Sequence, residues 1–147
     1  MGWVASMLVT VFKDSRSHTL LMDGGMSGIC LMHNLGMLSK GKVAVTGRSE
    51  GVETVVLSHG HSDHFKGLES FLAQHPGNLP VIMHPFALTP RRYQPENGSV
   101  HPMVGLDIEG IKRSGGAVEE RREPSTTASG LVLVTGQIER CTDFETS

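Results

Sequence analysis

The sequence predicts an α/β fold in which a mixed sheet is flanked by helices. Short apolar runs rich in β-branched residues, at 55–57, 80–83 and 131–135, are typical of buried strands. Between the first two runs, the apolar side chains of residues 65–74 recur at helical spacing. The chain has 147 residues, of which 38% are hydrophobic, enough for one core. We therefore expect a single domain over residues 1–147.

The first third of the chain predicts a β-hairpin followed by a helix. The elements expected in order are a strand at 4–12, a polar turn at 13–17, a strand at 19–22 and a helix at 27–38. The sharp turn Asp23-Gly24-Gly25 separates the hairpin from the helix. Ile29, Met32 and Met37 or Leu38 are expected on the inner face of that helix.

After the strand at 55–57, the rest of the chain predicts three more strands, two helices and a long loop. After the strand at 55–57 we expect a helix at 65–74, a strand at 80–83, a loop at 89–103, a helix at 106–113, a strand at 117–122, a turn at 124–130 and a buried strand at 131–135. Prolines and glycines punctuate the loop and the helix ends.

Three histidines and one aspartate gather in residues 59–64, His-Gly-His-Ser-Asp-His, directly after an apolar strand. Imidazole and carboxylate groups bind zinc and similar metals. In an extended segment His59 and His61 point the same way, whereas Asp63 and His64 fall where the next helix begins. One bend therefore aims four ligands at roughly one place. The alternative is a loop of solvated histidines without a metal.

This motif resembles the His-x-His-x-Asp-His signature of the metallo-β-lactamase superfamily, including the Gly67-Leu68 that follows it. Residues 20–25, Leu-Leu-Met-Asp-Gly-Gly, are similar to the strand ending in Asp-Thr-Gly that precedes the motif in that family. The resemblance implies an αββα sandwich made of two similar halves. This chain matches the N-terminal half only, so the domain is expected to be incomplete: a fragment, a short gene product or a relic.

A finer resemblance is to the branch of dihydropterin-methyl-ribofuranosylaminobenzene-phosphate synthases. It rests on His33-Asn34, on the form Leu-Ser-His-Gly-His, on residues 135–140, Thr-Gly-Gln-Ile-Glu-Arg, and on Phe144-Glu145. Gln137 and Glu139 depart from the glutamate and proline typical of that branch. Residues 39–51 are an extra stretch relative to it.

The family resemblance implies a ligand set and a mechanism. His59 and His61 would hold one metal, and Asp63 and His64 a second; zinc is expected, as one or two ions, with manganese or iron possible. Metal-activated water would attack an ester, thioester, lactam or phosphodiester, and Asp63 would act as the catalytic proton acceptor. Asp23 would lie beneath the metals and orient ligands. The alternative for Asp23 is an ordinary Asp-Gly turn.

Three further residues are weaker candidates. His84 stands before Pro85 at the end of a predicted strand, where it either lines the cavity or simply ends the strand. Arg91 and Arg92 lie in the proline-rich loop and would meet an anionic substrate or form solvated surface.

Charge and composition limit the classes of molecule that the protein is expected to bind. A formal net charge of −2 gives no electrostatic case for nucleic acid or an anionic membrane. The apolar stretch at residues 3–12 is too short to span a bilayer, and it has no basic leader. Cys30 and Cys141 are expected to be reduced thiols, which favours the cytoplasm. The expected partners are a small-molecule substrate and either the missing C-terminal half or a second copy of the chain.

Two functions remain open on the sequence alone. The first is a metal-dependent hydrolase whose activity belongs to a longer or assembled form. The second is a non-catalytic remnant of the same fold that binds metal weakly or serves as an interaction domain. Such an isolated half is expected to expose an apolar face of its sheet.

Overall fold

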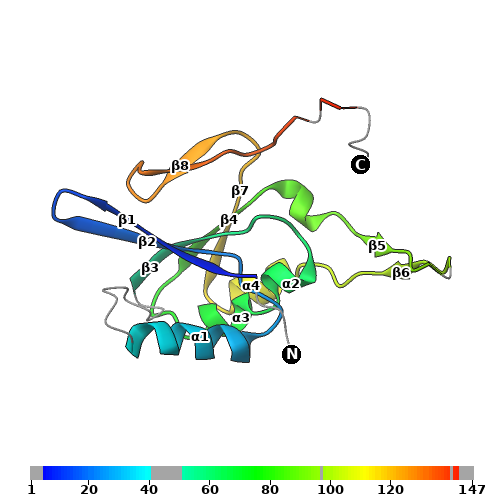
Figure 1. Cartoon of the computed structure of the whole chain (residues 1–147), viewed down its shortest axis with the longest axis horizontal. Coiled ribbons are helices and arrows are strands. Elements are labelled where there is room, and N and C mark those ends of the chain that lie inside the picture. Colours follow the sequence, from blue (N-terminus) through cyan, green and yellow to red (C-terminus); the bar gives the residue numbers. More distant parts are fainter. Residues whose placement is uncertain (1–4, 41–50, 97, 140, 143–147) are drawn as a thin grey trace.

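A five-stranded mixed sheet forms the centre of the protein (Figure 1). The computed structural model describes residues 5–40, 51–96, 98–139 and 141–142. The sheet has the order β1-β2-β3-β4-β7. β1 and β2 form an antiparallel hairpin, and β2, β3, β4 and β7 run parallel. The strands are β1 (Met7–Lys13), β2 (Arg16–Met22), β3 (Val52–Val56), β4 (Leu79–Met83) and β7 (Gly116–Glu120). The predicted α/β class with a mixed sheet is confirmed.

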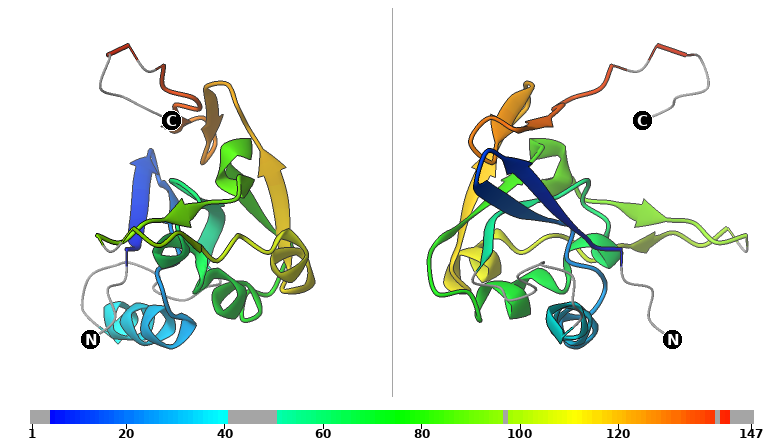
Figure 2. Two further views of the ribbon diagram at one scale, coloured as in Figure 1. Left: turned by 90° about the vertical axis from the view of Figure 1, so that its right-hand side faces the viewer. Right: turned by 60° about the vertical axis from the view of Figure 1, so that its left-hand side comes forward.

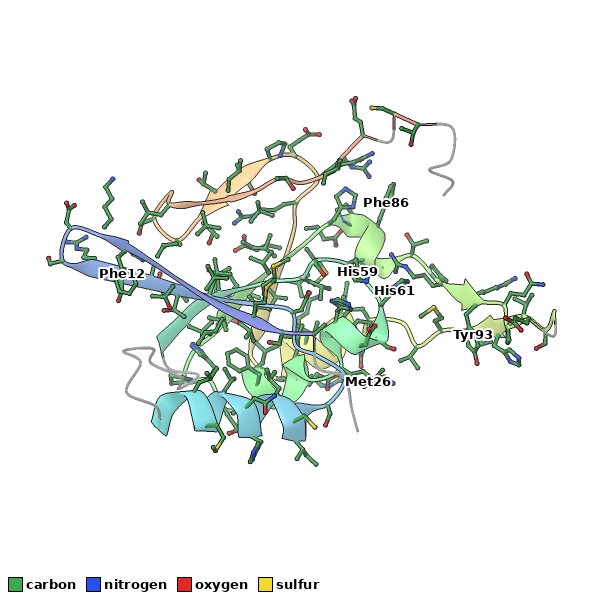
Figure 3. The ribbon with its side chains drawn as sticks, in the orientation of Figure 1. Phe12, Met26, His59, His61, Phe86 and Tyr93 are labelled. Carbon is green, nitrogen blue, oxygen red and sulfur yellow. The ribbon has the colours of Figure 1, made fainter. Side chains whose placement is uncertain are left out.

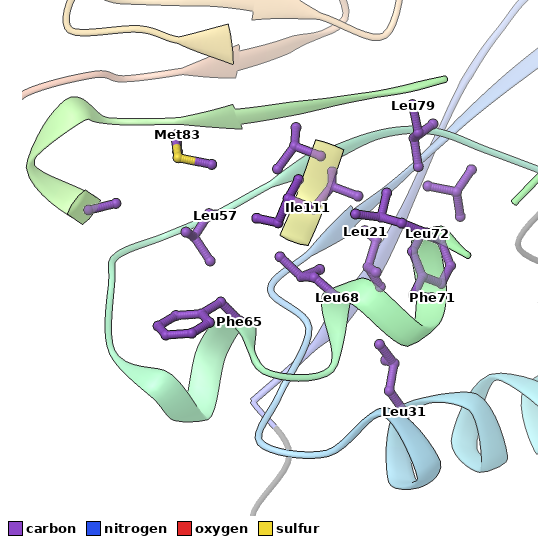
Figure 4. Close-up of a cluster of buried hydrophobic side chains, with 14 of the residues drawn as sticks. Leu21, Leu31, Leu57, Phe65, Leu68, Phe71, Leu72, Leu79, Met83 and Ile111 are labelled. Carbon is purple, nitrogen blue, oxygen red and sulfur yellow. The ribbon is translucent and has the colours of Figure 1, made fainter. Parts of the chain in front are cut away.

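The helices cover one face of this sheet, as two further views show (Figure 2). They are α1 (Gly28–Lys40), α2 (Ser62–Phe65), α3 (Leu68–Leu72) and α4 (Ile108–Arg113). The core lies between the helices and the sheet (Figure 4). Leu21 and Val55 from the strands are fully buried there, as are Leu68 and Phe71 from α3. Parallel strands joined by helices bury continuous apolar runs in this way.

Helix α1 forms as predicted but buries a different face. Leu31 and Leu35, which are 2% and 4% exposed, contribute to the core. Ile29 is 85% exposed, and Met37 and Leu38 also lie in solvent. The predicted inner face was therefore wrong, except for Met32, which packs partly against the core. Apolar side chains lie all around this helix, so its periodicity alone did not select the face that meets α3.

The helix predicted at 65–74 is instead two short helices, α2 and α3, separated at residues 66 and 67. Backbone groups that would continue one helix bond elsewhere: Gly24 N–H donates to His64 O at 2.5 Å, and Gly67 N–H donates to Gly25 O at 3.0 Å. A Cβ on Gly67 would collide with the carbonyl oxygen of Gly24. The turn after β2 thus interrupts the helix at residues 66 and 67, and it is hydrogen-bonded to the chain on both sides of the break.

Two small hairpins stand outside the central sheet. β5 (Arg92–Tyr93) and β6 (His101–Pro102) pair within the segment predicted as a loop, and form a ribbon that projects from the body (Figure 1). β8 (Ser125–Thr127) and β9 (Val132–Val134) pair where a turn and a buried strand were predicted. Leu133 is 63% exposed, so the buried strand was wrong: β9 alternates in exposure because it has only β8 beside it.

The β8–β9 hairpin lies on the side of the sheet away from the helices (Figure 2). Thr127 Oγ1 is 3.2 Å from Thr54 Oγ1 of β3. Leu20 and Ile82 belong to the strands but not to the helix-side core, and are only 4% and 1% exposed. The expectation of an exposed apolar sheet face is therefore wrong at the centre of the sheet.

Some expectations fall outside the described residues. The extra stretch predicted at 39–51 is described only at its ends, and Phe144-Glu145 is not described. Cys30 and Cys141 are free cysteines, as predicted. Within the described ranges, no helix is both long enough and apolar enough to cross a membrane.

Candidate metal centre

The candidate ligands lie at the carboxyl end of β3, on the loop that leads into α2. β2 and β4 flank β3 and run parallel to it, so the segments leaving β2 and β3 emerge at the same edge of the sheet. Asp23 N–H donates to Val56 O at 3.0 Å, and Leu57 N–H donates to Ile82 O at 2.9 Å. These bonds extend the strand pairing by one residue and place Asp23 directly beside the loop. Ligands and active sites often gather at the carboxyl ends of parallel strands.

Asp23 is the buried anchor of this region. Its side chain is 6% exposed, and Asp23 has a left-handed backbone with φ of 61°. Oδ1 accepts the Ser58 N–H at 2.8 Å, and Oδ2 accepts the Ser58 hydroxyl at 2.7 Å. Oδ2 also lies 2.8 Å from His64 Nδ1. A buried carboxylate with three hydrogen bonds is satisfied, and it fixes the groups that donate to it.

The network around Asp23 sets the tautomers of two histidines. Because Asp23 accepts from His64 Nδ1–H, the Nε2 atom of His64 keeps its lone pair. The Ser58 hydroxyl donates to Asp23, so it accepts from His59 Nδ1–H at 2.9 Å. His59 Nε2 is then also left with a lone pair. Both Nε2 atoms are in the form that binds a metal.

The four candidate ligands form two close pairs. His59 Nε2 lies 3.0 Å from His61 Nδ1, and His64 Nε2 lies 3.6 Å from Asp63 Oδ2. The His59 and His64 ring centroids are 4.0 Å apart, so the three imidazoles cluster. Figure 3 shows His59 and His61 together on the loop before α2. The structure brings all four predicted ligands together with Asp23, whereas their metal-binding role stays a prediction.

The donor geometry fits zinc in pairs. Two ligand atoms bound tetrahedrally at about 2.0–2.1 Å from zinc lie about 3.3 Å apart. The two observed separations, 3.0 and 3.6 Å, fall on either side of that value. Within residues 5–40, 51–96, 98–139 and 141–142, however, no group of three or more His, Cys, Asp or Glu side chains is arranged to hold one ion. Each pair therefore offers two of the three or four protein ligands that zinc usually takes.

Electrostatics keep His59 neutral. Burial lowers the pKa of His59 below its ordinary value of 6.5, and the nearby imidazoles of His64 and His61 lower the pKa further. The carboxylates of Asp23 and Asp63 oppose this effect. A metal ligand must be unprotonated, so a lowered pKa favours binding near neutral pH.

We expect acid to destabilise the zinc-free protein through His59. The folded-state pKa lies below that of the unfolded chain, so the unfolded state binds more protons once the pH falls below about 6.5. The contribution is zero at higher pH, and the free energy of unfolding decreases as the pH falls through the folded pKa. In urea unfolding between pH 8 and pH 5, the free energy of unfolding of His59→Gln should decrease less than that of the wild-type protein. An identical pH dependence in the two proteins would contradict this assignment.

His84 lines a cavity beside the candidate centre. This was one of the two roles predicted for it from the sequence. The cavity has a volume of about 940 Å³, and Ser58, His59 and His61 also line it. His84 Nδ1 accepts the Phe86 N–H at 3.1 Å and so caps the 3₁₀ helix η2 (Pro85–Leu88). The proton is then on Nε2, which is buried and has no partner among the described residues. His84 therefore both ends the strand and forms part of the cavity wall.

Arg91 has a structural role that the sequence did not reveal. Its guanidinium donates to the carbonyl oxygens of Gly60, Ala87 and Thr89 at 3.2 Å, and to Phe86 O at 2.9 Å. It thereby joins the loop after β3, which carries the candidate ligands, to η2. Ser58 was missed in the same way, although it precedes His59 in the motif. No sequence signal marks either role, because the bond from Ser58 to Asp23 and the bond from Arg91 to Gly60 join segments that meet only in the folded chain.

Comparison with known proteins shows a likeness in structure but none in sequence. No protein-family model and no curated protein sequence matches the chain. The fold is similar to the crystal structure of MEM-A1, a subclass B3 metallo-beta-lactamase isolated from a soil metagenome library, at 17% sequence identity and a TM-score of 0.44. The match covers 87% of this chain and 48% of that one. The chain thus spans about half the length of the solved structure it matches.

Proposed function

We propose that this chain carries half of the metal centre of a metal-dependent hydrolase of the metallo-β-lactamase type. The most direct support is the spacing of the donor atoms. The donor atoms of His59 and His61, and those of Asp63 and His64, lie at distances close to those between two ligand atoms on one zinc ion. Asp23 and Ser58 hold His59 and His64 in the tautomer that binds a metal. A loop of solvated histidines would need no such buried anchor.

Different side chains of the protein would perform different steps at such a centre. Zinc, when bound, would lower the pKa of a water molecule and make it nucleophilic near neutral pH. The carboxylate of Asp63, whose side chain is 46% exposed, would accept the proton that this water loses. Asp23 would hold His64 in place. The neighbouring cavity would receive a small-molecule ester, thioester, lactam or phosphodiester.

Two donors for each ion are too few for a tight site. We therefore propose that further ligands come from a segment beyond this sequence or from a second copy of the chain. Zinc suits the imidazole-rich donor set best, and manganese or iron would also accept it. The proposed location is the cytoplasm, where the free thiols of Cys30 and Cys141 would stay reduced.

A second candidate function follows from the absence, in the part of the chain that the structure describes, of any group of three ligands. The chain would then be a non-catalytic domain that binds metal weakly or meets a partner protein. It would keep the Asp23 anchor as a structural feature.

Zinc titration of the purified chain separates the two functions. We expect zinc to bind in a way that His61→Ala weakens at least tenfold, because that change removes half of one donor pair. His33→Ala is the matched control, since His33 is an exposed histidine on α1. Isothermal titration calorimetry with a competing chelator measures the affinity. Turnover of a phosphodiester and a thioester substrate, lost in His61→Ala but kept in His33→Ala, would support the hydrolase.

The contrary outcomes are equally clear. Zinc binding without turnover, in the chain alone and with any added C-terminal half, favours the non-catalytic domain. No binding at micromolar zinc, or equal loss in both variants, contradicts a metal centre at these residues.

A further inference from the structure

We propose that the cavity beside the candidate centre binds small organic anions, and that Arg92 receives the anionic group. This inference deepens the proposed function by naming a substrate class, and it rests on that function for its link to catalysis. It concerns the protein's own side chains and does not require a bound metal.

The charges of the cavity wall are of one sign. Among the described residues that line it, the charged side chains are Arg91 and Arg92, and none is an aspartate or glutamate. The histidines in the wall are His59, His61 and His84. A cavity lined by cations and lacking carboxylates attracts anions and repels cations. Any metal held by His59 and His61 would add to this preference.

Only one of the two arginines is available to a ligand. Four backbone carbonyl oxygens take up the guanidinium of Arg91. Arg92 is exposed on β5, and its side chain has no hydrogen bond or ion pair with any other described residue. A planar guanidinium with free donors binds carboxylate and phosphate groups with two parallel hydrogen bonds. Arg92 is therefore the receptor, and Arg91 is part of the scaffold that carries it.

The same wall contains a second unused donor. His84 Nε2–H is buried without an acceptor, because Nδ1 is engaged by the Phe86 N–H. A buried donor without a partner destabilises the protein, because it has lost its hydrogen bonds to water. An oxygen of a bound anion that reached it would satisfy it.

Apolar side chains form much of the remaining cavity wall, next to the polar side chains of Ser58, Thr89 and Gln137. Phe86, Pro90, Met103 and Ile138 line it, and Phe86 and Ile138 are 52% and 76% exposed. Figure 3 shows Phe86 on η2, above the loop that carries His59 and His61. These side chains offer contact to a hydrocarbon or aromatic group. The ligand that fits is thus an anionic group attached to an apolar body, with the anion at Arg92.

Binding to the zinc-free protein tests this proposal without catalysis. Phenyl phosphate, benzoate and benzyl alcohol share an aromatic ring but differ in charge, and each is titrated in the presence of EDTA by NMR chemical shift. We expect the anions to bind at least fivefold more tightly than benzyl alcohol, with shifts in residues of the cavity wall. Arg92→Gln should remove this difference, since it removes the charge but keeps a side chain of similar size. Arg16→Gln, an exposed arginine in the β1–β2 hairpin, is the control.

Each outcome decides the proposal. Equal affinity for all three probes, or anion binding that Arg92→Gln leaves unchanged, overturns it. Anion binding that appears only when zinc is present assigns recognition to the metal and also overturns it, while the proposed hydrolase would stand. Preference for phenyl phosphate over benzoate, or the reverse, identifies the anionic group. If zinc binding fails but Arg92-dependent anion binding persists, the binding site stands and the hydrolase falls.

Discussion

Replacing Asp23 by asparagine is expected to weaken zinc binding about 10- to 100-fold. Asparagine adopts the left-handed backbone of this position and can still accept the Ser58 N–H. Its amide NH₂, however, takes the place of Oδ2 and presents a donor to His64 Nδ1. His64 must then carry its proton on Nε2, the atom that faces Asp63. The variant keeps all four ligands but presents His64 in the wrong tautomer. It also removes the acceptor of the Ser58 hydroxyl, which sets the tautomer of His59.

The measurement is a zinc titration against a chelator of known affinity, together with urea unfolding. The free energy of unfolding should fall by about 1–3 kcal/mol, because one buried hydrogen bond is lost. Asp14→Asn is the matched control: Asp14 also has a left-handed backbone, with φ of 55°, but is exposed in the turn between β1 and β2. Wild-type zinc affinity in Asp23→Asn would show that the buried carboxylate does not govern His64.

Replacing Gly67 by alanine is expected to cost about 3 kcal/mol or more of folding stability. The backbone of Gly67 has an ordinary φ of −79°, so conformational freedom is not what requires glycine here. The requirement is close approach: an added Cβ would meet the carbonyl oxygen of Gly24 and lie 3.2 Å from that of Ser27. Backbone atoms cannot yield as a flexible side chain can. Either the turn after Asp23 or helix α3 must therefore move.

Urea unfolding measures this loss, and the zinc titration should show a parallel weakening because the displaced turn carries Asp23. Gly36→Ala is the control with the opposite sign. Gly36 lies within α1, and a Cβ there would meet nothing within 4 Å. Alanine should raise stability by about 0.5–1 kcal/mol, since it favours the helix. Equal effects of the two substitutions would show that the contact between Gly67 and Gly24 is not tight.

The strands of the central sheet were predictable where the sequence has continuous apolar runs, because such strands are buried on both faces. β3 and β4 lie where continuous β-branched runs predicted buried strands, and the hairpin of β1 and β2 also matches. Prediction failed where another part of the chain changed the local outcome. Residues 65–74 have helical spacing, but the turn at 24 and 25 takes hydrogen bonds that a continuous helix would need. The spacing of apolar residues cannot show that another segment takes these hydrogen bonds.

The burial of the β8–β9 hairpin and of the inner face of α1 could not be predicted from sequence either. Apolar positions in 28–38 allow more than one inner face, and contact with α3 selected Leu31 and Leu35. The strand predicted at 131–135 exists as β9, but its single partner β8 leaves Leu133 in solvent. Composition predicts that a run can form a strand, whereas the number of neighbouring strands decides how deeply it is buried.

The sequence by itself determined the candidate chemistry, because three imidazoles and a carboxylate within 59–64 follow a buried strand and one bend must carry them together. Only the tertiary structure decided which nitrogen of each histidine is free, since Asp23 reaches Ser58 and His64 from the end of a neighbouring strand. It also separated Arg91, whose guanidinium is held by carbonyl oxygens of η2 and of the loop after β3, from Arg92, which lines the cavity. The bonds of Asp23 and the bond from Arg91 to Gly60 join segments that are distant in the chain, and local spacing cannot predict such bonds.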